Sequence, residues 1–243
     1  MHIPDGLIGP GTSFGASAVA VGALAWCVRD QHTSIDDRQV PLAGMAAAYI
    51  FAVQMLNFPV ASGTSGHLLG GVLAAVLVGP RLGAVCVSVV IVVQAMLFAD
   101  GGLSALGLNI VNMALVGAIG GYAIFVTLRR VLPRRPQSVV LASGIAAALA
   151  PPLAALMFTL EYALGGNEAA SVTTVAASMV GAHVIIGIGE GVITALTVSA
   201  VITARPELVW GASNLDALQH TPAGAAAGTA ASTAASTAID RMR

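Results

Sequence analysis

The stretch LGAVCVSVVIVVQAMLFA, residues 82–99, contains no charged residue, although Arg81 precedes it and Asp100 follows it. A helix needs roughly 20 apolar residues to cross a lipid bilayer, so this stretch is typical of a transmembrane helix. The composition of the chain agrees, because 57% of its 243 residues are hydrophobic and only 9% are charged. A soluble domain carries about 25% charged residues. The sequence therefore predicts an all-α integral membrane protein.

Six other apolar stretches follow the same pattern, and together the seven predict a seven-transmembrane-helix bundle. The expected spans are residues 9–28, 40–57, 67–80, 82–99, 104–128, 138–161 and 174–203. Between the second and third spans, the residues VASGTS (60–65) are rich in Gly and Ser, which favours an inserted loop or re-entrant turn over a helix. We expect residues 1–203 to form one membrane domain.

The basic residues test this count and orient the helices. All ten are arginine, and with seven spans all ten fall on one face of the membrane: Arg29, Arg38, Arg81, Arg129, Arg130, Arg134, Arg135, Arg205, Arg241 and Arg243. Six or eight spans would scatter them over both faces. Positively charged short loops stay in the cytoplasm, so we expect the N-terminus and the 60–65 loop outside and the C-terminus inside a prokaryotic cell membrane.

The outer face has the opposite charge. It holds Asp5, Asp100, Glu161 and Glu168 and no arginine. An anionic surface raises the local concentration of cations, which favours a cation as the captured species. The alternative, that positive-inside sorting alone removes arginine from this face, remains open.

The composition also excludes some chemistry. A chain without lysine has neither a Walker A loop nor a Schiff-base nucleophile, so we expect a non-enzymatic protein whose ATP hydrolysis, if needed, comes from another subunit. The first basic residue is Arg29, whereas a cleavable signal peptide begins with a basic region; we therefore expect Met1 to be retained. Residues 204–243 end in an Ala/Thr-rich, low-complexity sequence, which predicts a disordered cytoplasmic tail.

The chain begins MHIPDG (1–6), and this start can chelate a metal ion. The Met1 amine, the His2 backbone nitrogen and the His2 Nδ1 atom close a five-membered and a six-membered ring around one ion. They fill three corners of a square once the peptide nitrogen loses its proton, and His67 is the candidate for the fourth corner. Four nitrogens in a plane favour Ni(II) or Cu(II) over Zn(II) or Mg(II). An exposed terminal His2, and a capping or buried polar role for His67, remain alternatives.

Four motifs resemble one known family. They are MHIPDG (1–6), NFPVASGTSGH (57–67), VVQAMLFADGGLSALGLNIVNM (92–113) and HVIIGIGEGVIT (183–194). In order and spacing they are similar to the substrate-binding membrane subunits, or S components, of cobalt and nickel energy-coupling-factor transporters, of the CbiM and NikM type. The resemblance covers about residues 1–203.

The resemblance implies a subunit that captures Co(II) or Ni(II) on the outer face, without a prosthetic group of its own. Its implied partners are a transmembrane coupling subunit, a pair of cytoplasmic ATPases and often a small accessory membrane protein. In the family, the amine of Met1, the amide and ring of His2 and a histidine matching His67 bind the metal in a plane, which makes residues 1–8 the metal-binding segment. No residue separates cobalt from nickel, although the loop GTSGHLLGG (63–71) is more similar to that of cobalt-type members, which serve cobalamin synthesis.

Other polar residues are candidates for supporting roles. Asp5 is expected to anchor the N-terminal segment. A second group, expected to orient the loop that carries His67, consists of Asn57, Ser62, Thr64 and Ser65. Asn109 and Asn112 lie in the outer half of the fifth span, where buried amides need partners. Ordinary packing is the alternative for each of these residues.

His183 and Glu190 are seven residues apart and so share one face of the last span. Ionisable groups inside a membrane are functional candidates, and metal release, proton transfer and packing of the bundle all remain open for this pair. Two other functions compete with metal capture for the whole chain. An intramembrane metalloprotease is disfavoured because HExxH is absent, and a stand-alone divalent-cation channel or facilitator would carry flux without ATPase partners.

Overall fold

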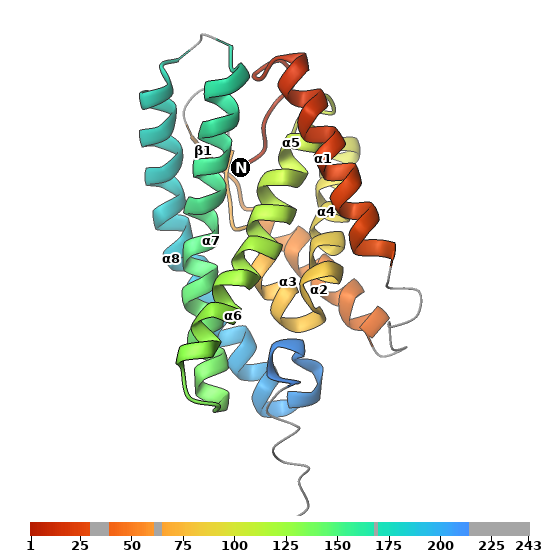
Figure 1. Ribbon diagram of the computed structural model, residues 1–243, viewed down its shortest axis with the longest axis vertical. Coiled ribbons are helices and arrows are strands. Elements are labelled where there is room, and N and C mark those ends of the chain that lie inside the picture. The colour runs from red at the N-terminus through yellow and green to blue at the C-terminus, as the bar shows by residue number, and fades with distance from the viewer. Residues whose placement is uncertain (30–38, 61–64, 168–169, 214–243) are drawn as a thin grey trace, which may run out of the picture.

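The protein is an elongated bundle of helices, as the computed structural model in Figure 1 shows. The structure describes residues 1–29, 39–60, 65–167 and 170–213. Within these residues, five helices are long and apolar enough to cross a membrane: α1 (Pro10–Arg29), α4 (Pro80–Leu97), the continuous helix Leu106–Val131, α7 (Pro136–Gly165) and α8 (Val172–Ala204). The apolar helix α2, Gln39–Gln54, is shorter. The architecture is that of an all-α, multi-pass membrane protein.

The helix Leu106–Val131 is not regular along its length. It consists of α5 (Leu106–Ile110), a π-helical segment (Val111–Gly120) and α6 (Gly121–Val131). The wider π-helical turn is frequent at functional sites, and this one begins at Val111, two residues after the buried Asn109.

The third expected span, residues 67–80, is helical only in its second half. Helix α3 covers Gly71–Val78, a rise of about 12 Å, which is too short to cross a bilayer alone. Gly70, immediately before it, has φ 71°, a left-handed conformation that glycine adopts without strain and that a continuing helix excludes. The prediction of a helix from residue 67 was therefore wrong. All eight residues of α3 are buried, so protein rather than lipid surrounds this short helix.

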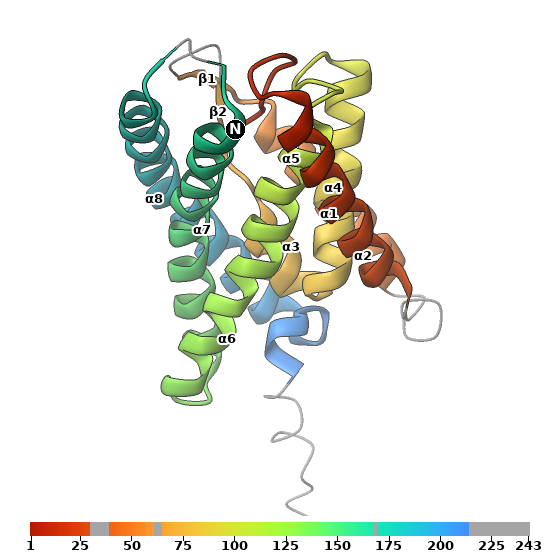
Figure 2. The same ribbon diagram turned by 45° about the horizontal axis from the view of Figure 1, so that its top comes forward.

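The expected loop between the second and third spans is extended where the structure describes it. Strand β1 (Phe58–Pro59) pairs antiparallel with β2 (Ser65–Gly66), with Phe58 opposite Gly66. The rest of the loop, including Ser62 and Thr64, lies outside the described residues. Figure 2 shows the two strands and the N-terminus at the same end of the bundle.

Helix α3 packs closely against the π-helical segment, and Gly71 makes this possible. A Cβ atom at Gly71 would lie 2.8 Å from the backbone nitrogen of Ala118 and 2.8 Å from the carbonyl carbon of Gly117. Two backbones meet here, so neither side can yield by a rotamer change.

Replacing this glycine is expected to destabilise the fold. Gly71→Ala should lower the free energy of unfolding by about 1–3 kcal/mol, the usual cost of an overpacked core, measured by thermal unfolding in detergent. Gly44→Ala is the matched control, because no atom lies within 4 Å of its Cβ position and alanine favours the helix. Equal melting temperatures for the two variants would contradict this view of α3.

The first part of the expected tail, residues 204–243, is folded. After α8, two 3₁₀ turns at Pro206–Leu208 and Trp210–Ala212 turn back against the bundle. The Trp210 ring packs 3.2 Å from the Cβ position of Gly79, at the end of α3. The prediction of a disordered tail was wrong for residues 204–213, because this aromatic anchor precedes the low-complexity sequence. Residues 214–243 lie outside the described residues.

Candidate metal centre

The N-terminus of the chain is buried in the protein. Met1 is 1% exposed, His2 3% and Ile3 0%. An exposed terminal histidine, one of the alternatives left by the sequence, is therefore wrong. Burial removes water from the terminal amine and from the first backbone amides, and this is costly unless other groups bind them.

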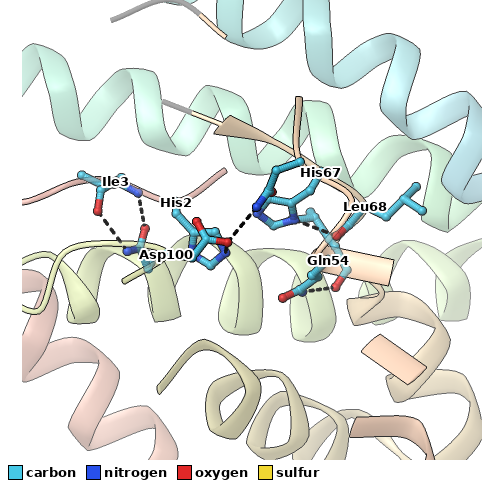
Figure 3. Close-up of polar contacts among 9 residues, drawn as sticks. His2, Ile3, Gln54, His67, Leu68 and Asp100 are labelled. Atoms are coloured by element: carbon cyan, nitrogen blue, oxygen red, sulfur yellow. Dashed lines mark hydrogen bonds and ion pairs between the residues drawn. The ribbon is translucent and has the colours of Figure 1, made fainter. Parts of the chain in front are cut away.

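A two-way pair of hydrogen bonds fixes the backbone next to His2. The Ile3 N–H donates to Asn109 Oδ1 at 2.8 Å, and Asn109 Nδ2 donates back to the Ile3 carbonyl at 3.3 Å. The Gly102 N–H donates to the same carbonyl at 2.8 Å. Figure 3 shows the Ile3 pairing beside His2. Among the described residues, the His2 backbone nitrogen donates no hydrogen bond.

Asp5 anchors the turn that follows. Its Oδ1 atom accepts hydrogen bonds from the Ser104 backbone N–H at 2.8 Å and from the Ser104 hydroxyl at 2.5 Å. These bonds favour the charged form and lower the pKa of the Asp5 carboxyl. A Cβ atom at Gly102 would collide with the Asp5 backbone nitrogen. The Gly101–Gly102 pair thus gives the N-terminal segment room to lie against the 98–105 loop.

Removing the Asn109 amide is expected to loosen the chain end. Asn109→Ala leaves the buried Ile3 N–H without its acceptor, which costs about 1–3 kcal/mol and should lower the melting temperature. Because the chain has no lysine, an amine-selective reagent labels Met1 alone, and this labelling should become faster in the variant. Gln137→Ala, which removes an exposed amide in the first turn of α7, is the control. Unchanged labelling in Asn109→Ala would contradict the anchoring role.

His67 lies between β2 and α3 and is fully buried, at 0% exposure. Its Nδ1 atom lies 2.8 Å from the Leu68 carbonyl oxygen. A carbonyl only accepts, so Nδ1 carries the hydrogen and Nε2 presents a lone pair. This Nε2 atom is buried and has no hydrogen-bond partner among the described residues. A ring held through one nitrogen with the other free is the state of a metal-binding histidine.

The structure brings His2 and His67 together. Their ring centroids are 4.7 Å apart and their planes meet at 28°, and Figure 3 shows the two residues side by side. Within the described part of the chain the His2 Nδ1 atom has no hydrogen-bond partner, and Nε2 lies 3.6 Å from Asp100 Oδ2. Burial lowers the pKa of the Met1 amine and of the His2 imidazole below their ordinary values. Both shifts favour the neutral forms, whose lone pairs can bind a cation.

The possible metal ligands around His2 and His67 are nitrogen atoms of different chemical types. Among the residues that the structure describes, no group of three or more His, Cys, Asp and Glu side chains is arranged to hold a metal ion. The nitrogens at this place include the Met1 amine, the amide and ring nitrogens of His2 and the His67 Nε2 atom. Nitrogen donors of this type suit late divalent transition metals.

Comparison with known proteins identifies the family. Residues 2–208 match CbiM, the cobalt uptake substrate-specific transmembrane region. The chain belongs to the CbiM family. A Haloquadratum walsbyi protein, provisionally named a metal transport protein, is 38% identical over 213 residues, 86% of this chain and 94% of its own. An Archaeoglobus fulgidus protein, provisionally named the fused nickel transport protein NikMN, is 36% identical over 212 residues, 86% of this chain and 68% of its own.

The fold has a relative of known structure as well. A crystal structure of a truncated transition metal transporter matches with a TM-score of 0.78 and 30% sequence identity, covering 84% of this chain and 99% of that chain. This CbiM-family chain is therefore a multi-pass membrane component of cobalt or nickel uptake.

Not every supporting residue of this CbiM-family site could be named from its sequence. Asn57 Nδ2 donates to Asp100 Oδ2 at 2.8 Å, so Asn57 supports the acid beside His2 rather than the His67 loop. Ser65 lies in β2, directly before that segment, and among the described residues its buried hydroxyl has no partner. Asp100 and Ser104 were missed, and the signal for both was the unusual Gly-rich loop at the end of the fourth span.

Proposed function

We propose that this protein is the substrate-capturing subunit of an energy-coupling-factor importer, which binds Co(II) or Ni(II) on the outer face of the membrane. The observation that carries the proposal is the buried chain start, with Met1 at 1% exposure and the His2 ring 4.7 Å from that of His67. Burying a terminal amine without a partner is costly, and coordination of a cation by the amine would offset this cost.

The proposed ligands are the Met1 amine, the deprotonated His2 amide, His2 Nδ1 and His67 Nε2, in one plane. Support comes from the two ring nitrogens, neither of which has a hydrogen-bond partner among the residues that the structure describes. The Ile3–Asn109 bonds also hold the adjacent peptide while leaving the His2 amide free. The carboxylate of Asp100 near His2 adds negative charge beside the incoming cation. A planar nitrogen set suits nickel, whereas the family description names cobalt, so the proposal covers both metals.

The proposed topology has seven spans, with α3 and the extended residues before it as the third. It places the N-terminus and the metal site outside and the C-terminus in the cytoplasm, with residues 1–203 as the membrane domain and residues 1–8 as its metal-binding segment. Support comes from the arginine distribution, which leaves one end of the bundle without a basic residue under this count.

The proposed partners supply what this chain lacks. Without lysine the chain has no Walker A loop, so a pair of cytoplasmic ATPases would drive uptake through a transmembrane coupling subunit. An accessory membrane subunit is a third proposed partner, which the fused nickel transport relative supports.

Metal titration of the purified protein tests the proposal. With the free N-terminus verified by mass spectrometry, the protein is expected to bind one equivalent of Ni(II) or Co(II). Absence of binding to either metal would refute capture. Robust cation flux in vesicles that contain this chain without ATPase partners would instead identify a stand-alone facilitator.

A further inference from the structure

A buried carboxylate from α8 contacts the segment that carries His67. Glu190 is 2% exposed, and its Oε2 atom accepts a hydrogen bond from the Leu69 backbone N–H at 2.6 Å. Its Oε1 atom accepts one from the Gly70 N–H at 3.0 Å. Both oxygens of the carboxyl group therefore act as acceptors, one for each backbone N–H.

These two peptide groups lie where α3 begins. The first N–H groups of a helix have no partner within the helix, and negative charge near a helix N-terminus is stabilising. Glu190 therefore satisfies donors that would otherwise be unpaired inside the membrane. The same two bonds fix the backbone two and three residues after His67.

A second side chain holds the segment from another direction. Gln54, at the end of α2 and 0% exposed, donates from Nε2 to the Leu69 carbonyl at 2.7 Å, as Figure 3 shows. The peptide units on both sides of Leu69 are thus held by two different helices. The Leu68 carbonyl, one residue earlier, accepts the hydrogen of His67 Nδ1 and so sets the direction of the ring.

We propose that Glu190 is a positioning residue, which holds the Leu69–Gly70 backbone so that His67 Nε2 points to the metal. The proposal rests on the function proposed above. Simple packing of the bundle does not explain Glu190, because within the part of the chain that the structure describes its carboxylate oxygens accept from the backbone of the segment that carries His67.

Glu190→Gln is the test variant. An amide offers one acceptor oxygen and places an NH₂ group against the second backbone N–H, so one of the two bonds is lost. Loss of an outer partner of a ligand weakens metal binding about 10- to 100-fold, and we expect this loss in titrations with Ni(II) and Co(II). The absorption bands of the bound metal should also shift, because His67 leaves its place, whereas a packing defect would lower only the melting temperature.

Glu161→Gln is the matched control. Glu161 is a second buried carboxylate, 3% exposed, but its Oε2 atom accepts from Asn112 Nδ2 at 2.7 Å and not from the His67 segment. The control should keep the affinity and the absorption bands of the wild type. Equal weakening in both variants, or an unchanged Glu190→Gln, would overturn the proposal.

Glu190→Asp provides the conservative variant and covers the case in which Glu190→Gln does not fold. Its carboxylate is one methylene shorter, so we expect weaker binding than in the wild type with shifted bands, and tighter binding than in Glu190→Gln where both fold. Unchanged affinity and bands in Glu190→Asp would contradict positioning. Wild-type protein that binds no metal would refute the proposed function instead, and the two failures are therefore distinguishable.

Discussion

Extending the chain by two residues, Met-Leu placed before Met1, is expected to abolish tight metal binding. The native amine becomes a peptide nitrogen, so the five-membered ring with the His2 amide is lost, and the new amine lies too far along the chain to replace it. Loss of an outer partner alone costs about 10- to 100-fold in affinity; loss of a ligand should exceed about 100-fold. Met1 is also buried, at 1% exposure, so the added residues would have to displace the protein around it.

The length of the extension matters for this experiment. A single added residue would put the histidine third in the chain, where an amine, two amides and the imidazole form a four-nitrogen square by themselves. With two added residues the histidine is fourth in the chain, so this four-nitrogen chelate does not form. Leucine in the second position prevents cleavage of the initiating methionine. Titration with Ni(II) and Co(II), with the N-terminus checked by mass spectrometry, measures the effect. Affinity equal to that of the wild type would refute the amine as a ligand.

His67→Ala should have the second largest effect, a loss of affinity of more than about 100-fold, since it removes the fourth ligand. The free amine and His2 remain, so residual weak binding is expected. Phe125→Ala is the matched control, because it also removes a buried ring, 2% exposed, but one that packs against Tyr122 in the arginine-bearing part of the bundle.

The control variant should bind the metal far more tightly than His67→Ala, with a comparable drop in melting temperature from the lost packing. Similar losses of affinity in the two variants would mean that His67 acts through the stability of the bundle. That result would remove it from the ligand set.

Hydropathy predicted the long helices well, because lipid selects for apolar length and little else. Helix α4 begins at Pro80 and ends at Leu97, within two residues of the expected span 82–99. The prediction of the third span as a continuous helix failed because Gly70 adopts a left-handed conformation, although the composition of this stretch is as apolar as that of a transmembrane helix. Hydropathy carries no information on backbone conformation. It also does not predict that Trp210 packs against Gly79.

The pairing of His2 with His67 could be predicted because metal chemistry limits which residues are useful. Their supports could not. The contacts of Ile3 with Asn109 and of Leu69 with Glu190 join residues more than 100 positions apart, and helix packing alone decides them. In the sequence, Asn109 and Glu190 stand out only as polar residues within apolar spans. This indicates that each has a partner but does not identify it.

X-ray absorption spectroscopy of the protein loaded with one equivalent of Ni(II) tests the central claim most directly. The account predicts a planar first shell of four nitrogen donors, of which imidazole rings contribute two, and its loss in the two-residue extension. A first shell of carboxylate oxygen or sulfur, or the same spectrum in the extended chain, would contradict a site built from Met1, His2 and His67.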